Sequence, residues 1–268
     1  MKAPGLDLDT EDLAQLYETV SAERQYKAGQ RLVQDLEITA GETVLDLGCG
    51  TGLLAQHIAA IVGSNGSVVG IDPLPLRIEI AQRRKRSNLN FRTGNAYDLS
   101  EFPPATFDVV CMNAVFHWLP EKREPLRRII RVLKHGGRLG VSTGSKAGES
   151  PLHSIKDRVL SRAPYNRYPA ALEPVVHRVS VHEMATLLTE AGFEIKSIET
   201  RPNVRHELTP EASIRFSEAS SFGNFLGHLP AELRAQARED IRRELEQTGA
   251  LTGSSGNRSR IVAVAMEP

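Results

Sequence analysis

Short apolar runs alternate with amphipathic helical segments between residues 43 and 140. Runs rich in β-branched and apolar residues, each bounded by Gly, Pro, Asn or Asp, predict five strands, at residues 44–47, 68–71, 90–93, 107–112 and 138–142. Apolar residues at helical spacing predict helices between them, at residues 53–62, 76–86 and 121–133. Strands that alternate with helices are typical of an α/β fold, in which helices cover both faces of a parallel sheet.

The pattern continues with one more helix and two more strands. Ser180 and Glu183 have the S-x-x-E spacing of a capping box, which predicts a helix over residues 181–191. Strand-like runs follow at residues 194–200 and 260–265. We therefore expect the final run to complete the core sheet.

A helical insertion is predicted between the last two strands, at residues 201–257, within a single domain over residues 1–268. Thr209 as N-cap and Pro210 at the first helical position start an amphipathic, aromatic helix that is expected to reach Leu226. A second, highly charged helix and a Gly/Ser-rich surface loop follow it.

Charge and composition narrow the classes of protein. Lys and Arg together number 33, as do Asp and Glu, so the net charge is zero and nucleic acid is not an expected partner. The apolar runs are far shorter than the ~20 residues that cross a bilayer, and no signal-peptide pattern precedes them. Cys49 and Cys111 have neither metal-site nor disulfide spacing. We expect a cytoplasmic protein with no membrane partner and no metal.

The segment over residues 44–52 is a strand that runs into a glycine turn and opens a helix. Gly48, Gly50 and Gly52 let a nucleotide ligand approach the backbone closely. A dinucleotide fingerprint would need a glycine at position 53, where a leucine stands, which argues against NAD. Asp46, two residues before the first glycine, instead suits a ligand that carries an ammonium group.

Asp72 lies at the end of the second predicted strand, 20 residues after Gly52. An acid at this place can accept both ribose hydroxyls of an adenosine, and Pro73 then fixes the turn. S-adenosylmethionine (SAM) combines an ammonium group with an adenosine and has no pyrophosphate, so it fits Asp46 and Asp72 together.

Three ordered motifs resemble those of class I SAM-dependent methyltransferases, at residues 45–52 (LDLGCGTG), 70–72 (GID) and 107–110 (FDVV). The resemblance covers about residues 25–200 and includes 260–265 as the family's final strand. It implies a seven-stranded Rossmann-like sheet of order 3-2-1-4-5-7-6 with strand 7 antiparallel. It also implies SAM as cofactor, S-adenosylhomocysteine (SAH) as product, a small-molecule substrate, and a monomer or homodimer.

The resemblance implies roles for individual residues around the cofactor. The candidate cofactor contacts are Asp46, Gly48, Cys49, Gly50, Gly52, Asp72, Pro73, Asn95, Ala96, Asn113, Tyr17 and Gln25. The family usually has an acid at the position of Asn95, where it accepts a hydrogen bond from the adenine amino group. The amide oxygen of Asn95 can still accept that bond, although simple turn propensity also accounts for the residue.

Related enzymes place helices that close over the cofactor before the first strand, here within residues 1–40. Tyr17 and Gln25 are therefore candidate cofactor contacts, and Tyr26 is a candidate substrate contact. Ordinary packing along a helix face is the alternative for all three.

His117 follows the fourth predicted strand, whose C-terminal end should face the ligand crevice of an open α/β sheet. His117 is the candidate catalytic base, with helix capping or packing as the alternative. Trp118 is a candidate substrate contact or a packing residue. Sequences with His-Trp here are similar to methyltransferases of carboxylates, including the trans-aconitate and juvenile-hormone-acid enzymes, so a carboxylate acceptor is slightly favoured.

Phe216, Phe222 and Phe225 lie on the aromatic helix of the insertion. They either line a pocket or bury the insertion against the core, and Phe222 and Phe225 are candidate substrate contacts. Gly223 and Gly227 predict a local bend, because glycine in a helix costs roughly 0.5–1 kcal/mol relative to alanine. We expect the insertion to act as a lid over the substrate.

Three other functions stay open. Arsenite methyltransferases resemble this chain in length, but their pattern uses several cysteine thiolates to hold arsenic, whereas Cys49 belongs to the glycine turn and Cys111 to a strand. A non-catalytic SAM-binding module and an NAD-dependent oxidoreductase are the other two.

Overall fold

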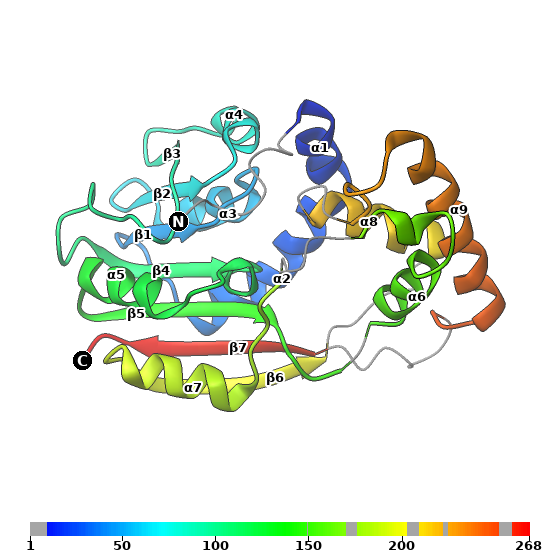
Figure 1. Ribbon diagram of the computed structural model, residues 1–268. Helices are drawn as coiled ribbons and strands as arrows, with labels where there is room; N and C mark the ends of the chain where they lie inside the picture. Colours follow the sequence, from blue (N-terminus) through cyan, green and yellow to red (C-terminus); the bar gives the residue numbers. More distant parts are fainter. Residues whose placement is uncertain (1–9, 149, 170–175, 203–208, 222–224, 252–258) are drawn as a thin grey trace.

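A seven-stranded sheet forms the centre of the molecule (Figure 1). The computed structural model describes residues 10–148, 150–169, 176–202, 209–221, 225–251 and 259–268. The strands are β1 Thr43–Leu47, β2 Ser67–Asp72, β3 Leu89–Thr93, β4 Phe107–Asn113, β5 Leu133–Gly144, β6 Glu194–Pro202 and β7 Ser259–Met266. Their order is β3-β2-β1-β4-β5-β7-β6, and β7 is antiparallel to both of its neighbours while the other pairs are parallel. The predicted sheet order and direction are confirmed.

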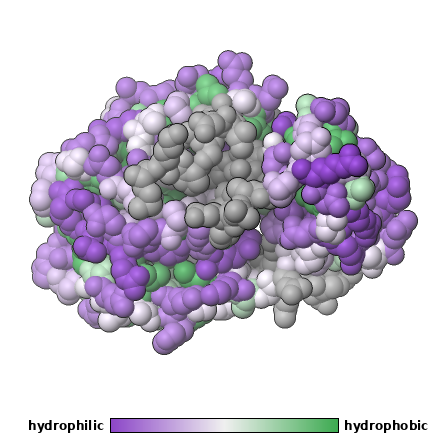
Figure 2. Space-filling view, viewed as in Figure 1, coloured by the Kyte–Doolittle hydropathy of each residue, from purple (hydrophilic) through white to green (hydrophobic). Residues whose placement is uncertain are grey.

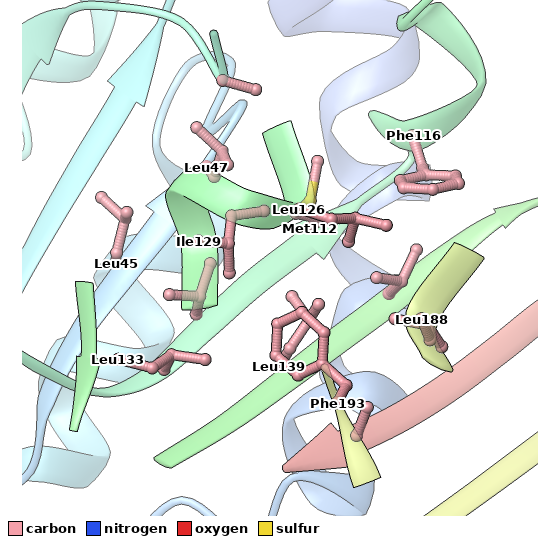
Figure 3. Close-up of a cluster of buried hydrophobic side chains, with 14 of the residues drawn as sticks. Leu45, Leu47, Met112, Phe116, Leu126, Ile129, Leu133, Leu139, Leu188 and Phe193 are labelled. Atoms are coloured by element: carbon pink, nitrogen blue, oxygen red, sulfur yellow. The ribbon is translucent and has the colours of Figure 1, made fainter. Parts of the chain in front are cut away.

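Helices cover both faces of the sheet, because its central strands are buried on both sides and carry mainly apolar residues. One face packs against α2 (Ala22–Asp35), α3 (Leu53–Val62) and α4 (Pro75–Gln82). The other packs against α5 (Arg123–Val132) and α7 (Val181–Glu190), where leucine, isoleucine and methionine side chains from strands and helices interdigitate (Figure 3). The sheet is therefore held rigidly, and its strand ends are fixed platforms for a site.

The ends of two helices test the sequence analysis directly. The capping box of α7 is confirmed: Ser180 Oγ accepts from the Glu183 N–H at 3.1 Å, and Glu183 Oε2 accepts from the Ser180 N–H at 2.7 Å. By contrast, α4 ends at Gln82 instead of reaching Arg86. Arg86 instead forms an antiparallel bridge with Leu89 that leads the chain into β3.

Three helices pack together beyond the C-terminal ends of β4 and β5, which point toward them in Figure 1. We call this group the helical cap; it consists of α6 (Pro151–Leu160), α8 (Pro210–Ser220) and α9 (Ala231–Thr248). The cap has its own buried apolar cluster, separate from the two clusters of the sheet. It is built from two connections of the chain, because α6 lies between β5 and α7 whereas α8 and α9 lie between β6 and β7.

Helix α6 was not predicted from the sequence. Its start has the same signals as that of α8: Ser150 is the N-cap, whose Oγ accepts from the His153 N–H, and Pro151 takes the first helical position. The aromatic helix was predicted to reach Leu226, but α8 ends at Ser220, whose Oγ donates to the Phe216 carbonyl at 2.7 Å. A side-chain bond to the preceding turn of this kind competes with continued helix.

The described residues expose few large hydrophobic side chains. Figure 2 shows hydrophilic side chains over most of the face in view. Among the described residues, the exposed large hydrophobic side chains are those of Tyr168 and Val181. In that part of the chain, no helix combines the length and the apolarity that crossing a membrane requires.

Phe225 tests whether the helical cap depends on its own core. This side chain is 3% exposed and packs in the apolar cluster of the cap. Phe225→Ala is expected to destabilise the protein by about 3–5 kcal/mol, the usual cost of deleting a buried phenyl ring. Urea denaturation followed by circular dichroism measures the change. Phe216→Ala is the matched control, because that ring is only half-buried and should cost clearly less; equal costs would contradict the assignment of Phe225 to the core.

Candidate active site

A cavity of about 1030 Å³ lies between the C-terminal strand ends, α2 and the helical cap. Leu47, Asp72, Asn113 and Ser142 line it from four parallel strands, and Phe216 lines it from α8. The strand order reverses between β1 and β4, and ligands of open α/β sheets bind at such a point. Its volume is at the upper end of the ~300–1000 Å³ that ligand pockets occupy.

Three positions of the turn between β1 and α3 must be glycine. Gly48, Gly50 and Gly52 all have positive φ angles, of 82°, 55° and 87°. A Cβ on Gly48 would lie 2.2 Å from Cγ2 of Val115, which is closer than any real contact. The turn therefore presents bare backbone to the cavity, which Gly48 lines.

Asp72 ties this turn to the end of β2. Its Oδ2 accepts from the Gly50 N–H at 2.9 Å and its Oδ1 accepts from the Leu74 N–H at 3.0 Å. The residue is buried and lines the cavity, as does Pro73. A carboxylate at this place can accept ribose hydroxyls, and that role of Asp72 stays a prediction.

Asp46 is a buried carboxyl with an unsatisfied oxygen. It is 2% exposed, and among the described residues its Oδ2 has no hydrogen-bond partner. Burial first, and the charge of Asp72 second, raise the pKa of Asp46 to about 7. Asp46 borders a small pocket of about 30 Å³ that shares Gly48 with the main cavity. That is room for one ammonium group or one bridging water, so the acid fits the ligand predicted for it.

Tyr17 covers the glycine turn from the N-terminal side. It begins a π-helical turn, Tyr17–Ser21, between α1 (Glu11–Leu16) and α2. Its hydroxyl would lie 3.0 Å from a Cβ on Gly50, and the Arg77 guanidinium stacks 3.8 Å from its ring centroid. Burial raises the pKa of Tyr17 to about 12, so it keeps its proton at neutral pH. Tyr17 lines both the main cavity and the small pocket.

Asn113 and Gln25 connect the sheet to α2. Asn113 Nδ2 donates to the Gln25 carbonyl at 2.8 Å, while its Oδ1 accepts from Arg260 at 3.2 Å. Both residues line the cavity. Asn95 and Ala96, which follow β3, also line the cavity. Asn95 Oδ1 accepts a hydrogen bond from the Tyr97 N–H at 2.9 Å. The turn role of Asn95 is thus observed, and its contact with adenine stays a prediction.

His117 and Trp118 lie side by side on a single 3-10 turn after β4. Their ring centroids are 4.9 Å apart, and both residues line the cavity. His117 Nδ1 is 2.9 Å from Oγ1 of Thr143 on β5, which orients the ring, and the His117 carbonyl accepts from the His177 N–H at 2.7 Å. The structure therefore places the candidate base at the wall of the cavity.

The structure distributes the predicted substrate contacts differently. Tyr26 borders only the small pocket, accepts a hydrogen bond from Gln30 at 2.9 Å, and stacks edge-on against His57. Phe225 is buried in the cap and does not line the cavity, so packing accounts for its position. Phe222 lies outside the described residues. Phe216, which the sequence analysis weighed but did not select, is the phenylalanine of α8 that lines the cavity.

Three arginines were not singled out from the sequence. Arg24 on α2, Arg178 before α7 and Arg260 on β7 all line the cavity. They are far apart in the chain, so no local motif marks them. Their only sequence signal is that Arg260 opens the final strand-like run.

Comparison with known families identifies the family and the fold. A methyltransferase domain family model matches residues 38–192. The chain belongs to this family. Membership confirms the resemblance noted in the sequence, and SAM is the cofactor of the family. The glycine turn, Asp46 and Asp72 all lie within the matched residues, and they stay the predicted contacts of SAM.

Relatives within the methyltransferase family differ in what they are named for. An arsenite methyltransferase of Halobacterium salinarum is 30% identical over 207 residues, which cover 75% of this chain and 48% of the relative. A trans-aconitate 2-methyltransferase of Methylobacterium nodulans is 28% identical over 217 residues, which cover 80% of this chain and 81% of the relative. This chain spans between 42 and 63% of the length of the first three curated relatives that it matches.

Solved structures share the fold at low identity. A geranyl diphosphate methyltransferase in complex with SAM has a TM-score of 0.56 at 16% identity, with 91% of this chain and 85% of that chain covered. A [4+2]-cyclase, SpnF, has a TM-score of 0.59 at 19% identity, with 91% and 81% covered. These neighbours confirm the methyltransferase fold, and the second shows that the fold alone does not set the reaction.

The raised pKa of Asp46 predicts how SAH binding depends on pH. An ammonium group stabilises the ionised carboxyl, so binding should release a proton below about pH 7 and the affinity should increase from about pH 5.5 to about pH 7.5. Asp46→Asn should weaken SAH binding by about tenfold, the loss of one charge-assisted contact, and flatten the profile. Calorimetry in buffers of different ionisation enthalpy measures both; a flat wild-type profile would contradict the pairing.

The same carboxyl should lower the stability of the free protein at neutral pH. The pKa of Asp46 is higher in the folded protein than in the unfolded chain, so the folded state holds the proton more tightly. The contribution of Asp46 to the stability of the fold is therefore greatest below about pH 4, and it falls as the pH rises through about 7. Asp46→Asn should therefore melt at a higher temperature than wild type at about pH 8 without ligand. A lower melting temperature would mean that the carboxyl is needed for folding.

Asp72 is expected to control both the turn and the cofactor. Asp72→Ala removes the acceptor of two backbone N–H groups and of the ribose hydroxyls, so SAH binding should weaken by more than about tenfold, or roughly 1.5–3 kcal/mol. Titration with SAH measures the loss of binding, and thermal melting of the same variant measures any loss of stability from the turn. Wild-type affinity in a folded variant would refute the ribose role.

Proposed function

We propose that this chain transfers the methyl group of SAM to a small-molecule acceptor held in the cavity. The observation that carries the proposal is the unsatisfied oxygen of Asp46 in a small pocket at the glycine turn, where Gly48 borders both this pocket and the main cavity. The cavity extends to His117, Trp118 and Phe216, which leaves room for a second molecule.

The residues on the acceptor side suit a displacement reaction. Bound SAM supplies an electrophilic methyl group on a sulfonium, and its transfer leaves neutral SAH. Trp118 and Phe216 would surround the acceptor and exclude water, while His117, oriented by Thr143, would take the proton of a hydroxyl or amine acceptor. A carboxylate acceptor is already ionised at neutral pH, so His117 would then only position it.

A carboxylate acceptor is favoured over arsenite. Both cysteines are buried, and burial holds the pKa of each thiol well above its usual value, so neither supplies a thiolate. Among the described residues, no group of three or more His, Cys, Asp or Glu side chains is placed to hold a metal ion. The relatives named arsenite methyltransferases keep arsenite as the second candidate. Two free thiols also support the cytoplasm as the proposed location.

A labelled-methyl screen tests the function. The full-length chain is incubated with methyl-labelled SAM and a panel of carboxylates, phenols, amines, thiols and arsenite with added thiol. Transfer to one of these acceptors is expected, with carboxylates first. SAH binding without transfer to any of them would favour a non-catalytic SAM-binding module, and absence of SAH binding would overturn the proposal.

His117→Gln tests the role of the base once an acceptor is known. For a hydroxyl or amine acceptor, kcat should fall by about 10²–10⁴, the usual contribution of a general base, while the SAH dissociation constant stays within about threefold. His135→Gln is the control, because its side chain is 89% exposed and bonds Pro268 away from the cavity. An unchanged kcat for such an acceptor would show that His117 is structural.

A further inference from the structure

The cavity is strongly cationic although the chain has no net charge. Its lining among the described residues includes eight basic side chains but only two acidic ones, Glu23 and Asp72. The basic residues are Arg24, Lys27, Arg31, Arg77, Arg178, Arg201, Arg215 and Arg260. A cleft lined by one sign of charge concentrates ligands of the opposite sign.

Five of these basic side chains pair with acids, lie at the surface or lie on the predicted cofactor side. Arg201 forms a two-pronged ion pair with Asp35, with N···O distances of 2.7 and 2.9 Å. Lys27 pairs with Glu23 at 2.9 Å. Arg77 lies over the ring of Tyr17 at the glycine turn, on the predicted cofactor side, and Arg31 and Arg215 are exposed. The partly buried guanidinium groups of Arg24, Arg178 and Arg260 are the ones that face the acceptor side; we call them the arginine cluster.

Arg260 is held in place by neutral acceptors. Its Nε donates to Ser142 Oγ at 3.0 Å, and its Nη2 donates to the Ser142 carbonyl at 3.3 Å and to Asn113 Oδ1 at 3.2 Å. These bonds orient the guanidinium without cancelling its charge. Asn113 also bonds the carbonyl of Gln25 on α2, so Arg260 sits where the acceptor side adjoins the residues predicted to contact the cofactor.

A missing side chain on β5 brings Arg178 to the same place. Gly144 is the cross-strand partner of Arg260 in the β5–β7 pair, so a Cβ on Gly144 would point to the same face as Arg260. Arg178 Nε lies 3.3 Å from that Cβ position. A larger residue at position 144 would push Arg178 away. The neighbouring His177 N–H bonds the His117 carbonyl, which places Arg178 beside the candidate base.

The positive charges of the arginine cluster favour binding of a negatively charged group. Burial first, and the charge of Arg24 second, lower the pKa of Arg260 to about 10. Burial likewise lowers the pKa of Arg178. Arg24 itself lies over the Phe216 ring, 4.2 Å from its centroid. Holding like charges together inside the protein is costly, and a bound anion would offset that cost.

We propose that Arg24, Arg178 and Arg260 form an anion-binding site that anchors the acceptor through a carboxylate or phosphate group. The inference rests on the proposed function, because it names the class of molecule that the methyl-transfer site admits. Guanidinium groups match both anions with paired N–H donors. The anchoring group lies beside His117, so it fixes the orientation of the acceptor next to the transferred methyl group.

Binding of simple anions tests the site before any acceptor is known. The chain has a single tryptophan, Trp118, which lines the cavity, so its fluorescence reports on occupancy. The SAH-saturated protein is titrated with succinate, citrate, inorganic phosphate and pyrophosphate. Saturable binding of at least one of them is expected, and it should weaken as salt is added. Whether carboxylates or phosphates bind more tightly identifies the anchoring group.

Variants assign the binding to the arginine cluster. Arg178→Gln and Arg260→Gln should each weaken anion binding by at least about tenfold, while the SAH dissociation constant stays within about threefold. Arg178→Lys should recover part of the loss. Arg215→Gln is the matched control, because that arginine lines the cavity but is exposed. Arg178 makes no ion pair with the rest of the described chain, so its variant keeps the test valid if Arg260→Gln does not fold.

Two results would overturn the anion site. One is SAH-saturated wild-type protein that binds none of the four anions. The other is a pair of variants that lose SAH instead of the anion, which would mean that the arginines hold the carboxylate of the cofactor. Failure of wild-type protein to bind SAH at all would instead overturn the proposed methyltransferase function, so the two failures are distinguishable.

Discussion

Two buried carboxyls, those of Asp46 and Asp72, lie close enough to one glycine turn to influence each other, and the geometry of the site follows from keeping them there. Asp72 accepts hydrogen bonds from one N–H group of the turn and from one N–H group after β2, so it connects the ends of two strands. Asp46 lies behind the turn, largely desolvated and with one oxygen unsatisfied. Such an arrangement raises the free energy of the protein without ligand, and a cationic ligand relieves it. The site is therefore built for binding at some expense of stability.

The strands of the sheet could be predicted because each strand is marked by a short stretch of the sequence. Apart from Asp46 and Asp108, the strands over residues 44–47 and 107–112 are apolar, and near-continuous apolar runs of this length are typical of buried parallel strands. Asp46, Asp72 and the glycines could also be predicted, since one strand-turn-helix segment and one strand end carry them. Strand order needed more than local pattern, and it came from the resemblance to a family.

The acceptor side could not be predicted in the same way. Arg24, Arg178 and Arg260 converge only after β5 and β7 pair in one register, with Gly144 opposite Arg260. A shift of that register by one residue would turn Arg260 to the other face, and nothing in the sequence near Arg260 specifies it. The helix α6 was missed although Ser150-Pro151 mark its start, because its apolar face packs on α9, more than 70 residues away in the chain.

The register of β6 and β7 places Pro202 opposite Ser259, the two residues between which α8 and α9 are inserted. Entry to and exit from this insertion are therefore neighbours, as in a long hairpin loop. Chain can be lengthened, shortened or exchanged between two such points at little entropic cost and without moving the strands. Evolution could thus remodel most of the helical cap while the cofactor end of the sheet stayed fixed, which gives one catalytic scaffold a route to many acceptors.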